Sequence, residues 1–183
     1  MAENTILVLG DSLSAAYGMQ PEQSWINLLR KQLVANDYHY QIVNASVSGD
    51  TTSGGLTRLP VLLKKYQPMV TIVALGGNDG LRGLSLSVIK TNLSAIIAMA
   101  QAAKSKVLVL GMRLPPNYGP AYTQQFQQAF TQVAKDRGVR VVPLMLEGVD
   151  ENIESFQADG IHPTAAVQPR IARNVWLALK PMI

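Results

Sequence analysis

The feature that most constrains the fold is a regular alternation of short apolar runs with longer segments of helical periodicity. Short apolar runs, β-branched in part, are typical of buried strands, whereas apolar residues spaced three and four apart are typical of helices. The expected strands cover 6–9, 40–45, 69–75, 106–112 and 139–143, and the expected helices cover 25–36, 56–63, 87–103, 121–136 and 164–179. Alternation of this kind predicts a parallel sheet of about five strands between two helical layers, a three-layer α/β/α sandwich of flavodoxin-like shape.

Two prolines bear on the helix boundaries. Pro60 is expected to break the helix over 56–63 near its start, because proline lacks the amide that a helix interior needs. Pro169 is expected in an early turn of the last helix, or at a kink in it. The segment 76–80 follows the strand expected over 69–75. It can be explained as an ordinary tight turn, since Asn and Asp favour turns.

Composition limits the classes to which the protein can belong. A chain of 183 residues with 48% hydrophobic and 15% charged residues predicts one globular domain over 1–183. The chain has no cysteine, which excludes disulfides and thiolate metal sites. Its net charge of +4 is scattered along the sequence, so nucleic acid is not expected as a partner. No apolar run is long enough to predict a membrane span.

Four polar loops directly follow predicted strands. They contain Ser12, Gly49, Asn78 and the segment 113–118. The carboxyl ends of parallel strands meet at one edge of a sheet, and ligands bind in the crevice beyond that edge. The sequence therefore predicts a functional site where these four loops converge.

A serine, a histidine and an aspartate are available for nucleophilic catalysis at this edge. Asp159 and His162 are three residues apart, so one turn can bring the carboxylate to one imidazole nitrogen and leave the other to act as a base for Ser12. The only other histidine, His39, lies between two tyrosines, where a packing or surface role is favoured. The alternative is that Ser12 and His162 only form turns or cap helices.

Three hydrogen-bond donors can converge near Ser12. They are the Ser12 amide, the Gly49 amide, which no side chain obstructs, and the side-chain amide of Asn78. Donors aimed at one point are what an oxyanion hole requires.

Several other chemistries lack their sequence signals. The chain has neither a phosphate-binding loop nor the glycine-rich turn of dinucleotide-binding folds. The residues around Ser12 lack the second glycine of a Gly-x-Ser-x-Gly nucleophile elbow. Candidate metal ligands are not clustered in the sequence. Beyond Asp159 and His162, the candidates are the isolated Asp50 and Asp79. We therefore expect no cofactor and no metal.

Four sequence blocks, taken together, resemble the SGNH (GDSL) hydrolases. They are Gly-Asp-Ser-Leu-Ser at 10–14, Asn-Ala-Ser-Val-Ser-Gly-Asp at 44–50, Gly-Gly-Asn-Asp at 76–79 and Asp-Gly-Ile-His-Pro at 159–163. Segments 75–83 and 113–119 also look like the bacterial arylesterase/thioesterase I/lysophospholipase L1 (TesA-like) branch. The resemblance extends over nearly the whole chain, and the blocks occur in the order typical of the family.

The resemblance implies roles for the same residues. Ser12 would be the nucleophile, His162 the base and Asp159 its orienting acid, with the oxyanion hole formed by Ser12, Gly49 and Asn78. It implies hydrolysis of fatty-acyl esters and thioesters, including lysophospholipids, without a cofactor. It also implies export to the periplasm, or secretion, after removal of a signal peptide, although a cytoplasmic location stays open. The partners expected are small-molecule acyl substrates, and the chain is expected to be a monomer.

The acyl pocket is expected beside these groups, with the loops 75–83 and 113–122 as walls. The residues expected to contact substrate are Asp11, Leu13, Asp79, Leu81, Leu84, Leu114, Pro115 and Tyr118. Apolar side chains beside a catalytic edge suit an acyl chain, although any one of them could simply pack its loop. Two other functions stay open: deacetylation of carbohydrate esters, and a non-catalytic binding module of the same shape.

Overall fold

A five-stranded parallel sheet forms the centre of the computed structural model, which describes residues 4–149 and 151–183. Its strand order is β2-β1-β3-β4-β5. The strands are β1 (Asn4–Gly10), β2 (Tyr40–Asn44), β3 (Val70–Ala74), β4 (Lys106–Leu110) and β5 (Arg140–Val142). All four neighbouring pairs are parallel, as the alternating sequence predicted.

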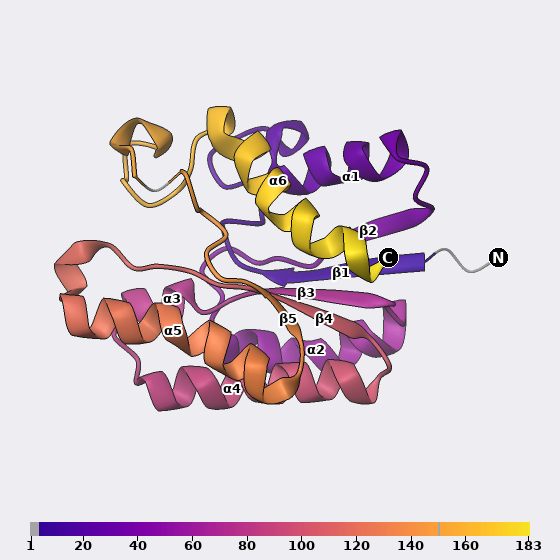
Figure 1. The fold of residues 1–183 in the computed structure, drawn as a ribbon, viewed down its shortest axis with the longest axis horizontal. Helices are drawn as coiled ribbons and strands as arrows, with labels where there is room; N and C mark the ends of the chain where they lie inside the picture. The colour runs from indigo at the N-terminus through magenta and orange to yellow at the C-terminus, as the bar shows by residue number, and fades with distance from the viewer. Residues whose placement is uncertain (1–3, 150) are drawn as a thin grey trace.

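Helices cover both faces of the sheet (Figure 1). One face carries α1 (Trp25–Ala35) and α6 (Gln168–Leu179), and the other carries α2 (Thr52–Tyr66), α4 (Leu86–Ala102) and α5 (Pro120–Arg137). The short helix α3 (Gly77–Leu81) follows β3 directly. The 3₁₀ turns are η1 (Pro21–Gln23), η2 (Pro116–Tyr118), η3 (Ile153–Ser155), η4 (Ala165–Val167) and η5 (Lys180–Met182). The predicted three-layer sandwich is confirmed.

The central strands are buried on both faces, which explains their sequences. All five residues of β3, Val-Thr-Ile-Val-Ala, are buried, and β1 is buried from Thr5 to Gly10. Such strands read as continuous apolar runs because helices exclude water from both sides of a parallel sheet. Every strand contributes to one hydrophobic core cluster, as do α1, α2, α4, α5 and α6. The single domain over 1–183 stays a prediction that this shared core supports.

The strand order places a crevice beside the end of β1. From β1 the chain moves outward to β2, then crosses back to β3 on the other side of β1. The order of the sheet reverses at this point, and the loops that leave β1 and β3 diverge to opposite faces. Gly10 is paired with Ala74 in the register of these strands, so the loops containing Ser12 and Asn78 start side by side.

Three local expectations are corrected or refined. Helix α2 extends over Thr52–Tyr66 with Pro60 inside it, so the predicted break near the start of a shorter helix is wrong. Burial of Leu59 and Leu63 on one face of α2 offsets the missing amide hydrogen bond of the proline. The 76–80 segment forms helix α3 rather than only a turn. Pro169 lies in the first turn of α6, as expected, but that helix begins at Gln168 rather than 164.

No helix in the described part of the chain is both long and apolar enough to cross a lipid bilayer.

Pro60 gives a direct test of the continuous α2 helix. Pro60 is exposed and lies inside the helix, so the Pro60→Ala variant regains an amide donor and loses the steric conflict of the proline ring. We expect the free energy of unfolding to rise by about 1–2 kcal/mol, after allowance for the more flexible unfolded chain. Urea denaturation measures this change, and a decrease in stability would contradict the account.

Candidate active site

Ser12 lies in a turn immediately after β1. The preceding residue, Asp11, shapes this turn because its Oδ1 accepts a hydrogen bond from the Leu13 amide at 3.0 Å. Its backbone carbonyl also accepts from the Ser14 amide at 3.1 Å. The chain therefore turns sharply at the end of the strand and leaves the Ser12 side chain facing the carboxyl edge of the sheet.

Three side chains form a continuous hydrogen-bonded chain at this edge. The Ser12 Oγ lies 2.9 Å from His162 Nε2, and His162 Nδ1 lies 2.6 Å from Asp159 Oδ2. An ionised carboxylate can only accept, so Nδ1 carries the proton and Nε2 is free to accept from the Ser12 hydroxyl. The structure thus brings together the three residues that the sequence singled out as nucleophile, base and orienting acid.

Asp159 is held in its charged form. Its Oδ1 accepts from the backbone amides of His162 and Ile161, each at 2.9 Å. The backbone hydrogen bond from His162, with the side-chain bond from the same residue next in importance, lowers the pKa of Asp159 to about 2. The carboxylate is therefore ionised over the whole range in which an imidazole ordinarily titrates.

Long-range contacts hold the Ser12 turn against the His162 loop. The Trp25 indole donates to the Leu13 carbonyl at 3.1 Å, and the Trp25 amide donates to the buried Gln168 Oε1 at 2.9 Å. The Gln157 side chain donates to the Tyr17 carbonyl at 2.9 Å. These contacts tie α1, α6 and the loop before α6 to the residues around Ser12.

The Tyr17 ring lies next to the His162 ring, and the sequence analysis did not single out this tyrosine. Its centroid lies 4.2 Å from that of the His162 ring, with the planes inclined by 32°. The tyrosine covers one face of the imidazole and limits its rotation. Its place five residues after Ser12 is the only sequence signal that could have indicated it.

The three predicted oxyanion donors lie around one cavity beside Ser12. Ser12, Gly49 and Asn78 all line it. Among the described residues, no hydrogen bond engages the backbone amide of Ser12 or of Gly49. Gly49 has a φ of 81°, which glycine adopts without strain. Asn78 Nδ2 donates to the Asp50 carbonyl at 2.8 Å and, in a longer and weaker hydrogen bond, to Asp11 Oδ2 at 3.4 Å.

Asp11 is a buried carboxyl group beside this site. It is 2% exposed, and burial raises its pKa to about 6, against smaller opposing effects from the Leu13 amide and His162. Among the described residues, no lysine or arginine forms an ion pair with it. The carboxyl lines the cavity, and its contact with substrate stays a prediction.

The cavity has a volume of about 570 Å³ and mostly apolar walls. Leu13, Leu81, Leu114 and Pro115 line it, all of which the sequence placed there. Pro116 also lines it, within the predicted wall 113–122. The sequence analysis missed five further apolar residues of the lining, namely Met112, Leu146, Ile153, Phe156 and Ile161. Met112 could have been found because it ends a predicted strand; the others come from irregular segments without a periodic signal.

Three expected substrate contacts lie outside the cavity lining. Asp79 is fully buried, and its carboxylate accepts from the amide of Thr52 at 2.9 Å and from its hydroxyl at 2.5 Å. It fixes the start of α2, so its role is structural in this geometry. Tyr118 donates its hydroxyl proton to the Leu81 carbonyl at 2.8 Å, which ties two cavity walls together. Leu84 is 37% exposed and lies beyond the lining.

No group of three or more histidine, cysteine or carboxylate side chains that could hold a metal ion occurs in residues 4–149 and 151–183. The absence of a cofactor stays a prediction.

Comparison with known proteins identifies the family. Residues 8–168 match the sequence model of the GDSL-like Lipase/Acylhydrolase family. The chain belongs to this family. The resemblance inferred from four sequence blocks is confirmed, and with it the prediction of a carboxylic ester hydrolase.

Named relatives of this GDSL-like hydrolase match it over its full length. It is 48% identical to Esterase TesA of Pseudomonas aeruginosa, with 100% of this chain and 90% of the relative covered. It is 41% identical to thioesterase 1/protease 1/lysophospholipase L1 of Escherichia coli, with 100% of this chain and 86% of the relative covered. A crystal structure of TesA superimposes with a TM-score of 0.96 at 48% identity and covers 98% of this chain and 100% of its own.

The buried Asp11 carboxyl makes stability depend on pH in a defined direction. Its folded pKa of about 6 exceeds the ordinary 3.8, so the folded chain binds this proton more tightly than the unfolded chain. The associated stability is present below pH 4 and is lost as the pH rises through 6. Asn has no carboxyl group to titrate, so the Asp11→Asn variant should not lose this stability. The difference in free energy of unfolding, variant minus wild type, should therefore rise by up to about 3 kcal/mol from pH 4 to pH 8. Urea denaturation at several pH values measures the difference, and a pH-independent difference would contradict the assignment.

Proposed function

We propose that this chain is a serine esterase in which Ser12, His162 and Asp159 form the catalytic triad. The observation that carries the proposal is the unbroken chain of hydrogen bonds from Ser12 Oγ through the imidazole to the Asp159 carboxylate. The serine is partly accessible and lines the cavity, which gives an ester access to it. Nucleophile, base and orienting acid are thus in the relation that acyl transfer requires.

Each group has a defined step in this mechanism. His162 Nε2 takes the proton of the Ser12 hydroxyl as Oγ forms a bond to the acyl carbon. The tetrahedral intermediate collapses, the bond to the alcohol oxygen breaks, and the imidazolium returns the proton to that leaving group. Water then gives a proton to His162 and attacks the acyl carbon, and the free acid departs as Ser12 regains its proton. Asp159 stays ionised and stabilises the imidazolium in both halves.

The developing negative charge would be held by three donors. The backbone amides of Ser12 and Gly49, which are unengaged among the described residues, and the side-chain amide of Asn78 belong to residues that line the same cavity. An oxyanion would replace Asp11 Oδ2 as the acceptor of the weaker Asn78 hydrogen bond, at 3.4 Å. Each donor of this kind ordinarily contributes a factor of about 10²–10³ to kcat. Because the donors are fixed before substrate binds, they need no reorganisation during the reaction.

The cavity favours acyl groups with a hydrocarbon chain as substrates. Leucine, proline and isoleucine are the commonest apolar residues of its lining, and the polar residues of the lining include Ser12, Asn78 and His162. A lining of this kind removes apolar substrate surface from water while the polar groups orient the reacting carbonyl. We therefore infer carboxylic esters, thioesters and lysophospholipids as the substrate class. A monomeric state and an exported location stay predictions.

The role of Ser12 is tested by substitution against a neighbouring serine. Ser12→Ala should lower kcat for a p-nitrophenyl ester by more than about 10⁴-fold, because the nucleophile is lost. Ser14→Ala is the matched control, since Ser14 Oγ is buried without a hydrogen-bond partner among the described residues. Full turnover by the Ser12 variant would overturn the proposal, as would the absence of Ser12 labelling by a fluorophosphonate in the wild type.

The acyl pocket is tested with a chain-length series. Leu81→Trp puts a larger side chain into the cavity, so turnover of long p-nitrophenyl esters should fall at least tenfold relative to the acetate ester, by the loss of apolar contact. Leu84→Trp, on the same segment but outside the lining, should leave the preference unchanged. An unchanged preference in Leu81→Trp would contradict the pocket. A wild type restricted to acetate would favour the carbohydrate acetyl esterase instead.

A further inference from the structure

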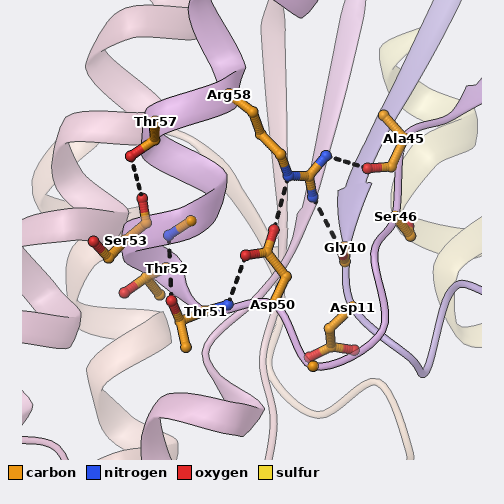
Figure 2. Close-up of polar contacts among 12 residues, drawn as sticks. Gly10, Asp11, Ala45, Ser46, Asp50, Thr51, Thr52, Ser53, Thr57 and Arg58 are labelled. Atoms are coloured by element: carbon orange, nitrogen blue, oxygen red, sulfur yellow. Dashed lines mark hydrogen bonds and ion pairs between the residues drawn. The ribbon is translucent and has the colours of Figure 1, made fainter.

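The side chain of Arg58, on helix α2, reaches from the helix to the ends of two strands (Figure 2). Its Nε donates to Asp50 Oδ2 at 2.8 Å, and its Nη2 donates to the Gly10 carbonyl at 3.2 Å. Its Nη1 donates to the Ala45 carbonyl. The Arg58 side chain is 25% exposed, and all three nitrogens of its guanidinium take part in these contacts, so the group is held in one position.

The three acceptors lie on two segments, the end of β1 and the loop after β2, and both segments lead to the proposed oxyanion hole. Gly10 ends β1, two residues before Ser12. Ala45 directly follows β2, at the start of the loop that carries Gly49. Asp50 is the residue after Gly49. One cation therefore connects the two strand ends that supply the backbone amides of Ser12 and Gly49.

Asp50 extends this connection to the third donor. Its backbone carbonyl accepts from the Asn78 side-chain amide at 2.8 Å, and its Oδ1 accepts from the Thr51 amide at 2.9 Å. Asp50 is thus bound to Arg58 through its carboxylate and to Asn78 through its carbonyl. Gly54 makes room for this carboxylate, because a Cβ there would lie 1.9 Å from Asp50 Oδ1.

We propose that Arg58, through its ion pair with Asp50, is a positioning residue that fixes the spacing of the three oxyanion donors. Arg58 is absent from the cavity lining and does not touch substrate. This role rests on the proposed function, because only a developing oxyanion makes the spacing of these donors matter.

The chemistry of the site requires arginine in particular. A guanidinium is planar and donates in several fixed directions at once, which matches a carboxylate on one side and two carbonyls on the other. A lysine ammonium is a point charge and cannot span these three acceptors from one position. Arg58→Lys therefore keeps the charge while it removes the geometric constraint.

Loss of the constraint should affect the transition state more than substrate binding. The donors would drift relative to one another while the apolar cavity stays intact, so kcat should fall and KM should change little. Removal of one whole oxyanion donor costs about 10²–10³-fold in kcat, so a displaced set should cost about 10–100-fold.

The experiment compares Arg58→Lys, Asp50→Asn and Arg30→Lys on a short p-nitrophenyl ester. Arg30 is the matched control, since its Nη2 also donates to a carbonyl of β2, that of Ile42 at 2.9 Å, but from α1 and away from the site. Active sites are counted by fluorophosphonate labelling carried to completion, so that kcat refers to folded enzyme only. The pH profile of kcat/KM is recorded as a check on the triad.

We expect kcat per labelled site to fall about 10–100-fold in both Arg58→Lys and Asp50→Asn, with KM within threefold and the acid limb of the pH profile unchanged. The double variant should lose little more than either single variant, because both act through one ion pair. Arg30→Lys should stay within twofold of wild type.

The proposal is overturned if kcat per labelled site in Arg58→Lys and in Asp50→Asn stays within twofold of wild type, even when fewer sites are labelled. That result would mean that the ion pair only stabilises the fold. Failure of the proposed function would give a different result. In that case the fluorophosphonate would not label Ser12 of the wild-type enzyme, or the Ser12→Ala variant would still hydrolyse the ester.

Discussion

The contact on which the site depends is the 2.9 Å hydrogen bond between Ser12 Oγ and His162 Nε2, which joins residues 150 positions apart. It exists because the turn after β1 and the loop before α6 reach the same edge of the sheet. Packing of α1 against α6 on one face of the sheet holds those segments together. The buried contact of Trp25 with Gln168, and the hydrogen bond from the Trp25 indole to the Leu13 carbonyl, connect this packing to the turn that carries Ser12, the proposed nucleophile. The arrangement of the layers therefore sets the geometry of the proposed catalytic site.

Two carboxyl groups near the serine have opposite environments and hence different chemistry. Asp159 is exposed and accepts three hydrogen bonds, which keep its pKa at about 2 and hold its charge beside His162. Asp11 is buried beside the proposed oxyanion site, where desolvation raises its pKa to about 6. The charge of Asp159 stabilises the imidazolium that would form on His162. The raised pKa of Asp11 opposes a carboxylate charge next to the proposed oxyanion, which such a charge would repel.

Much of the fold could be predicted from local sequence patterns, because strand and helix periodicity reflect burial on one or both faces. The meeting of Ser12 with His162 could be predicted too, since a parallel sheet brings the ends of its strands to one edge. The role of Asp79 could not, because its partner Thr52 lies 27 residues away and no spacing rule connects them. The same holds for Leu146 and Phe156, which reach the cavity from segments with no regular period. The extent of α2 was predicted wrongly because of Pro60. Burial of the apolar face of this helix in the core outweighs the local cost of a proline inside it.

The central claim is that turnover passes through an acyl group attached to Ser12 Oγ. Rapid chemical quench of the enzyme during steady-state hydrolysis of a p-nitrophenyl ester, followed by peptide mass spectrometry, tests it most directly. The account predicts a mass increase equal to the acyl group on the peptide that contains Ser12, formed as fast as the first equivalent of p-nitrophenol is released. Continued turnover with no acylated peptide, or with the acyl group on another residue, would contradict it.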